Sequence, residues 1–250
     1  MVAITEARSL SSTTPEIIYP SSDGEPLAET QQHASAILNT FGLLRLYLEN
    51  NLENNLQNQQ AVVFADQFLY YIEGNPKARV APDVMVVFGI TKKLYDNYKI
   101  WEWKQNPAII IEVTSAGTKD TDFNFKKMLY EQLGVTEYWL FDPYGEWIAE
   151  QLRGYRLNGS GIYEPITDYC SQVLQLRFEA DEYLINFYRL DNGEKLRTLE
   201  ELDAAIQAAE QRVEQAEQRA EQANQRAEQE RQRANRLTEK LRQLGVDLEE

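Results

Sequence analysis

Cysteine, histidine and long apolar runs are all scarce in this 250-residue sequence. It contains one cysteine, Cys170, and one histidine, His33. A single cysteine excludes an internal disulfide and a cysteine-based metal cluster. No stretch approaches the roughly 18 apolar residues of a membrane-spanning helix, and Met1–Thr14 lacks the apolar core of a signal peptide. The sequence therefore predicts a cytoplasmic protein without a membrane segment.

Basic residues are also scarce for a protein that would bind nucleic acid. The chain has 25 Lys and Arg against 40 Asp and Glu, a net charge of −15. Residues 1–198 hold 17 basic and 27 acidic side chains, and residues 199–250 hold 8 and 13, so both parts are acidic. An enzyme acting on DNA would have to gather its cations on one face.

Two apolar stretches rich in Val and Ile, 84–87 and 108–113, are predicted to be buried strands. Each is associated with one carboxylate, Asp83 near the start of the first and Glu112 near the end of the second. Burying a carboxylate is costly unless a metal, a cation or several donors compensate it. Oxygen ligands of this kind suit Mg²⁺ or Mn²⁺, so the pattern predicts a small acidic metal site.

The segment after this second strand is predicted to be a helix that ends at Gly134. Asp122, Lys126 and Tyr130 are four residues apart in turn, so they share one helical face. If this face meets the strand ends, Lys126 joins the two acids, and the set suits metal-assisted phosphodiester hydrolysis. The metal would generate hydroxide, and the lysine would orient water or offset developing charge. Alternatively, Asp83 merely shapes a turn and Lys126 pairs only with Asp122.

Four short motifs follow one another along the chain. They are A-P-D-V at 81–84, I-E-V-T-S at 111–115, D-x3-K-x3-Y at 122–130 and G-V-x-E-Y-W-x2-F-D-P at 134–143. Together they resemble the Uma family, restriction-endonuclease-like proteins of the PD-(D/E)xK nuclease superfamily, and the similarity spans residues 19–189. The resemblance implies an α/β restriction-endonuclease-like core, with a mixed β-sheet flanked by helices, that cleaves DNA with Mg²⁺.

The resemblance also implies the roles of individual residues. Asp83 and Glu112 would hold the metal with the Val113 carbonyl, and Glu29 of the first helix would be a further ligand. The superfamily's lysine usually lies two residues after the second acid, where this chain has Thr114. Lys126 resembles a migrated replacement that positions or activates the attacking water. The implied outer shell consists of His33, Asp122 and Tyr130.

The first helix is predicted to run from Pro26 to Leu56, on the helical spacing of its apolar residues. Glu29 and His33 lie four residues apart on it, which would place both at the rim of the site. The alternatives are that Glu29 complements the helix dipole and that His33 is an ordinary satisfied polar residue.

Lysines and aromatic residues alternate between residues 92 and 104. Such a segment could stack bases or line a backbone groove. Equally, it could be an aromatic flap packed over the core. The residues concerned are Lys92, Lys93, Tyr95, Tyr98, Lys99, Trp101, Trp103 and Lys104.

The last segment, 199–250, has a seven-residue apolar repeat, with a complementary apolar set three residues later. The pattern predicts a coiled coil, and parallel pairing of two chains would give a homodimer suited to cutting both strands of a duplex. A solvated single helix is the alternative. The first set consists of Leu199, Ile206, Val213, Ala220, Ala227, Ala234 and Leu241.

The sequence thus predicts a flexible N-terminus (1–18), a restriction-endonuclease-like domain (19–198) and a coiled-coil helix (199–250). Mg²⁺-dependent cleavage of DNA is the favoured function. One rival is a catalytically silent nuclease-fold module, dimerised by its tail, which the acidic charge favours. Another is a hydrolase of smaller phosphoesters, which would need a closed pocket.

Overall fold

The structure, a computed structural model, describes residues 17–22, 30–50 and 60–243. The chain divides into two compact units, Met1–Leu196 and Arg197–Glu250. Most of the predicted flexible N-terminus, 1–18, lies outside the described residues. No helix in the described part has the length and apolar character needed to cross a membrane.

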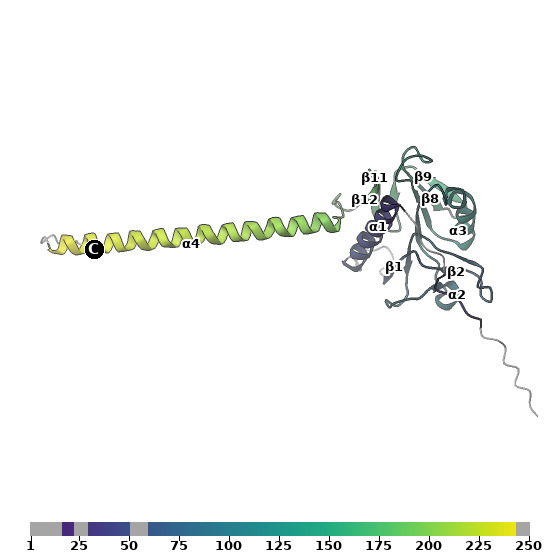
Figure 1. Cartoon of the computed structure of the whole chain (residues 1–250), viewed down its shortest axis with the longest axis horizontal. Helices are drawn as coiled ribbons and strands as arrows, with labels where there is room; N and C mark the ends of the chain where they lie inside the picture. The colour runs from purple at the N-terminus through teal and green to yellow at the C-terminus, as the bar shows by residue number, and fades with distance from the viewer. Residues whose placement is uncertain (1–16, 23–29, 51–59, 244–250) are drawn as a thin grey trace, which may run out of the picture. The chain divides into compact units, whose positions relative to one another are not determined.

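The first unit, with α1 and α3 labelled in Figure 1, is built around a mixed six-stranded sheet. The strand order of this sheet is β1-β4-β6-β7-β8-β9. Its only parallel pair is β6 with β7, and the other neighbours are antiparallel. Two three-stranded sheets, β10-β11-β12 and β3-β2-β5, accompany it. The six main strands are β1 (Ala61–Ala65), β4 (Val84–Phe88), β6 (Ile109–Val113), β7 (Glu137–Phe141), β8 (Leu152–Leu157) and β9 (Tyr163–Ile166). The shorter sheets contain β2 (Leu69–Tyr70), β3 (Arg79–Val80), β5 (Tyr98–Lys99), β10 (Cys170–Ser171), β11 (Leu176–Asp181) and β12 (Leu184–Arg189).

The helices of this unit lie against the two faces of the main sheet. Because alternate residues of a strand point to opposite faces, β6 supplies both cores. Ile109 and Ile111 pack in one cluster with α1 and β12, and Ile110 packs in the other with α3. The mixed α/β core expected from the sequence is confirmed at this level. The helices are α1 (Gln31–Asn50), α2 (Ile100–Trp103), the π-helix η1 (Thr121–Lys126) and α3 (Lys127–Leu133).

The start of α1 differs from the prediction. Within the described residues the helix begins at Gln31 and not at Pro26, because Thr30 acts as its cap. The Thr30 hydroxyl accepts a hydrogen bond from the His33 amide at 3.2 Å, and its carbonyl accepts one from Ala34 at 3.0 Å. Such a cap satisfies amides that have no partner inside the helix. The predicted end at Leu56 lies outside the described residues.

Single residues shape two of the strands. Asp66 adopts a left-handed conformation (φ 49°) between β1 and β2 and so separates these two strands. Gly154 lies inside β8 opposite Trp139. A Cβ at this position would approach the indole ring to 2.6 Å, so the ring requires glycine there.

The second unit consists of the 45-residue helix α4 (Leu199–Gln243). Thr198 and Glu201 form a capping box, in which each backbone amide donates to the other's side chain, at 2.9 and 3.2 Å. None of the helix residues is buried within the chain. The helix is therefore confirmed, and the coiled coil stays a prediction.

Candidate active site

Glu112 is the central acid of the site and is completely buried. It lies in β6, between β4 and β7, on the strand face that also carries Ile110. Tyr130 of α3 donates its hydroxyl to Glu112 Oε1 at 2.8 Å. Burial raises the pKa of Glu112, and Lys126 acts against this shift. The predicted strand and helix thus bring Glu112 and Tyr130 into direct contact.

Asp83 and Glu112 are linked through the backbones of the two neighbouring strands. Asp83 precedes β4, and its Oδ2 accepts a hydrogen bond from the Val113 amide at 2.6 Å. Glu112 Oε2 in turn accepts one from the Asp83 amide at 3.2 Å. Burial raises the pKa of Asp83 well above its usual range, and the nearby Glu112 carboxylate raises it further. The two carboxyl groups therefore occupy one small, poorly solvated space.

Lys126 supplies the cation at this position. Its Nζ lies 2.9 Å from Glu112 Oε2 and 3.0 Å from Asp122 Oδ1. Burial lowers the pKa of Lys126, but attraction to Glu112 and Asp122 outweighs this effect, so the net shift is upward. Lys126 is held as an ammonium group. It contacts both acids, so the alternative in which it pairs only with Asp122 is wrong.

The helix that carries these residues is not a regular α-helix. Asp122 and Lys126 lie in η1, a π-helical turn, and Tyr130 lies in the α-helix that follows. Gly134 ends α3 in a left-handed conformation (φ 78°), as predicted. Wide turns of this kind are often found at functional sites, where they displace side chains from regular helical spacing.

His33 reaches the other side of β6. It is buried in α1, and its Nε2 lies 2.6 Å from the Val113 carbonyl oxygen. A carbonyl can only accept, so Nε2 must carry the hydrogen. The carbonyl oxygen keeps a second lone pair, which could still face a metal. His33 therefore supports the site, while Glu29, its predicted neighbour, lies outside the described residues.

The acidic pair is suited to a hard divalent cation. Three carboxylates, those of Asp83, Glu112 and Asp122, face one lysine, and Asp122 Oδ2 has no hydrogen-bond partner in the described part of the chain. Within that part, no three His, Cys, Asp or Glu side chains are gathered as a metal cluster. Magnesium needs fewer protein ligands, because it binds one or two carboxylates and retains water. Two carboxylates and a carbonyl fit that requirement.

The remaining predicted residues have structural positions. Thr114, at the superfamily's usual lysine position, is buried. The aromatic segment 92–104 packs against the core: Tyr98 is buried, and Tyr95 contacts Phe64 and Trp103. The packing of these aromatic residues agrees with the flap interpretation, and contact of the segment with nucleic acid stays a prediction.

Two further buried acids, Glu137 and Asp142, were not singled out by the sequence. Glu137 accepts from Arg156 Nε at 3.0 Å, the Gln172 amide at 2.9 Å and Trp139 Nε1 at 3.3 Å. Asp142 accepts four backbone amides, from residues 144, 145, 147 and 148. The turn signal Asp142-Pro143 could have indicated the second, since an Asp at such a turn commonly binds following amides.

Comparisons with known proteins agree with the motifs. One solved structure, titled as a putative nuclease belonging to DUF820 from Anabaena variabilis ATCC 29413, is 16% identical and has a TM-score of 0.40. The match covers 63% of this chain and 82% of that one. Curated proteins gave no significant match. A family profile described as "Uma2: Putative restriction endonuclease" matches residues 7–178, so the resemblance is confirmed and this chain belongs to the Uma2 family.

Proposed function

We propose that this protein is a Mg²⁺-dependent endonuclease that hydrolyses phosphodiester bonds in DNA. The observation that carries the proposal is the contact of Lys126 with Glu112 at 2.9 Å, beside Asp83 in the same buried space. Two acids and a lysine are the side chains that metal-assisted phosphodiester hydrolysis requires. Family membership supports nuclease chemistry in general, and the metal and the reaction remain our proposal.

Asp83 and Glu112 would hold the metal, with the Val113 carbonyl and a contribution from Glu29. Mn²⁺ is an alternative occupant, since it accepts the same oxygen ligands. The bound ion would activate water and screen the phosphate charge. Its positive charge would also offset the excess of carboxylates around Lys126, which suits a site with three acids and one cation.

Lys126 would act by charge and position and not as a base. The neighbouring carboxylates raise its pKa, so the ammonium form persists at neutral pH. An ammonium group cannot take a proton from water, but it can orient water and stabilise a developing phosphorane charge. Tyr130 and Asp122 would fix its partners: Tyr130 orients Glu112, and Asp122 holds Nζ from the other side.

Cations near this segment would help an acidic protein to approach DNA. Lys127, next to Lys126, lies 4.1 Å from the ring centre of Tyr155, and Arg153 lies 5.8 Å from that of Phe123. Stacking on aromatic rings fixes such cations in place without neutralising them. They could contact phosphates on either side of the scissile bond.

The proposed reaction is tested with supercoiled and linear DNA in the presence of Mg²⁺ or Mn²⁺. The native protein should cut, and Asp83→Ala and Glu112→Ala should not. Asp120→Ala is the matched control, because this nearby acid is exposed to solvent. Failure of the pure, folded native protein to cut with either metal, or cutting that survives both substitutions, would overturn the proposal.

The competing proposal is a catalytically silent interaction module. The net charge of −15 favours it, and so does the saturation of Lys126 by two carboxylates. A module of this kind would retain Asp83 and Glu112 only as structural residues. It would be the better explanation if the native protein bound no metal and cut no DNA.

We also propose that α4 pairs with a second copy as a coiled coil. Leu199, Ile206 and Val213 recur at seven-residue intervals and are 73%, 57% and 58% exposed in the single chain. Such a stripe needs a partner to become buried. Ile206→Glu should lower the helical melting temperature if the helices pair, and should leave it unchanged if α4 is a single helix.

A further inference from the structure

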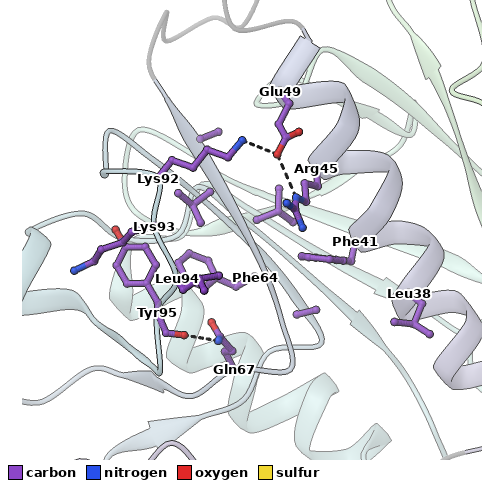
Figure 2. Close-up of a pocket in the computed structure, with 14 residues that line it drawn as sticks. Leu38, Phe41, Arg45, Glu49, Phe64, Gln67, Lys92, Lys93, Leu94 and Tyr95 are labelled. Atoms are coloured by element: carbon purple, nitrogen blue, oxygen red, sulfur yellow. Dashed lines mark hydrogen bonds and ion pairs between the residues drawn. The ribbon is translucent and has the colours of Figure 1, made fainter.

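The outer side of β1 is an open sheet edge. β1 ends the order of the main sheet, and in the described part of the chain no strand pairs with its outer side. A groove of about 560 Å³ is lined by all five residues of this strand. Figure 2 shows Phe41 and Arg45 reaching the groove from α1, and Lys92 and Tyr95 from the loop on the other side.

Within the described residues, the outward backbone groups of this strand have no strand partner. The Gly89 amide donates to the Gln60 carbonyl at 2.8 Å, and the Asp66 amide donates to the Asp83 carbonyl at 3.1 Å. The backbone groups of the even-numbered residues from 60 to 66 therefore point toward β4. In an antiparallel pair the direction alternates from one residue to the next. The residues whose amides and carbonyls point outward are therefore Ala61, Val63 and Ala65.

This edge lacks the devices that usually prevent strand pairing. The sequence of β1, Ala-Val-Val-Phe-Ala, has no charge and no proline, whereas exposed edges commonly carry a lysine, a proline or a bulge. Apolar side chains also flank it: Leu38 on α1 is 67% exposed and Leu94 on the loop is fully exposed. A half-buried, apolar edge without a neighbouring strand in the described residues is suited to the addition of another strand.

We propose that the occupant is β1 of a second copy, paired antiparallel about Val63. In this register Val63 faces Val63 of the second copy, and Ala61 faces the second copy's Ala65. Every outward amide and carbonyl of β1 then finds a partner, and the main sheet continues from one copy into the next. The contact is the same for both copies, as a two-fold axis requires.

The charges at the two ends of β1 favour this partner over an unrelated peptide. Arg45 and Lys92 lie at the Ala61 end, where both contact Glu49, at 3.2 and 2.6 Å. The opposite end carries the exposed Asp66. Antiparallel pairing places the acidic end of each copy beside the cationic end of the other, so the attraction occurs twice. A parallel arrangement would place like charges together.

Cysteine cross-linking tests both the contact and its register. In a Cys170→Ser background of the full chain, Val63→Cys should form a covalent dimer under mild oxidation. Opposed residues of this type have Cα atoms about 5.5 Å apart, within the range of a disulfide. Ala61→Cys and Ala65→Cys should not cross-link alone, because each would lie about 14 Å from its own counterpart, but an equal mixture of the two should.

The outcomes separate this contact from pairing through α4. A dimer held only by α4 would give no cross-link at position 63, which would overturn the proposal. Cross-linking by Ala61→Cys alone would overturn the antiparallel register. A monomeric native protein in light scattering would overturn the proposal that β1 pairs with a second copy. The partner of this edge would then be a different protein. Activity is not part of the test, so its result is independent of the nuclease proposal.

Discussion

The first unit contains two groups of buried acids that differ in how well they are compensated. Glu137 and Asp142 have a full set of partners: the first meets a guanidinium, an amide and an indole, and the second meets four backbone amides. Asp83, Glu112 and Asp122 share one lysine and three further donors, which are the Tyr130 hydroxyl and the amides of Asp83 and Val113, and Asp122 Oδ2 has no hydrogen-bond partner among the described residues.

The difference separates acids that hold the fold together from acids that could act on a ligand. A carboxylate whose acceptor positions are all hydrogen-bonded stabilises its surroundings and has no acceptor position available for a ligand. A group of acids with too few donors carries an unfavourable charge, which a bound cation would relieve. Perturbed carboxyl groups are more common at functional sites for this reason. Burial alone therefore does not identify the site, whereas incomplete compensation does.

The largest effect on the rate of DNA cleavage should come from removing the cation of one group and not that of the other. Lys126→Met should lower the rate of DNA cleavage by about 10²- to 10³-fold, because it removes the charge facing the phosphate. Arg156→Met, which removes the cation beside Glu137, should lower stability and leave the rate per folded molecule within about threefold. Initial rates and thermal unfolding of both variants check this. Equal losses of rate would contradict the distinction.

The next effect concerns stability. Asp142→Ala should lower the free energy of unfolding by about 3 kcal/mol, because four buried or half-buried amides lose their acceptor. For a domain of this size that corresponds to a melting temperature about 6 to 12 °C lower. Asp142→Asn is the matched control, since it retains one acceptor oxygen and should cost less. Unchanged melting of Asp142→Ala would show that the turn does not depend on this carboxylate.

Metal binding should stabilise the protein through the group of Asp83 and Glu112 only. With Mg²⁺ at ten times its dissociation constant, the native protein should gain about 1.4 kcal/mol of stability. Glu112→Gln should show no such gain, and Glu137→Gln, although less stable, should retain it. Differential scanning calorimetry with Mg²⁺ and with EDTA measures both. An equal gain in all three proteins would place the ion elsewhere.

The smallest effect is a gain in stability from removing an active-site acid. The pKa of Asp83 is raised in the folded protein, so its contribution favours folding below its unfolded value and is lost as pH rises through the folded value. In EDTA at pH 8, Asp83→Asn should therefore raise the melting temperature by about 3 °C, from a gain of about 1 kcal/mol. Near pH 4 the gain should disappear. A similar gain at both pH values would contradict the assignment.

Local patterns in the sequence were sufficient to single out the residues that meet at the centre of the candidate site, whose function stays a prediction. Asp83 and Glu112 stood out as acids beside apolar strands, and Lys126 and Tyr130 as neighbours on one helical face. These patterns involve residues that are close together in the chain or that lie on paired strands. The residue types at these positions were therefore enough to predict which side chains meet.

Other parts depend on tertiary contacts that local patterns do not encode. His33 forms a hydrogen bond with the Val113 carbonyl, 80 residues away in the sequence. No periodic pattern in the sequence predicts such a contact. The break between β1 and β2 depends on the left-handed conformation of Asp66. Asp residues adopt this conformation at only some positions, so the residue type alone does not predict it. The π-helical turn was missed because its residues also fit an α-helical repeat.

The π-helical turn makes the site sensitive to changes in chain length. A π-helix accommodates one residue more than an α-helix in the same turn, so deleting Asn124 from η1 would restore α-helical winding. Asp122 and Lys126 would then be three residues apart, a spacing that still places both on one helical face. The approach of Lys126 to Glu112 would change with the winding, although every side chain of the site would still be present. In this chain, insertions and deletions are therefore a route to losing nuclease chemistry that a comparison of site residues alone would overlook.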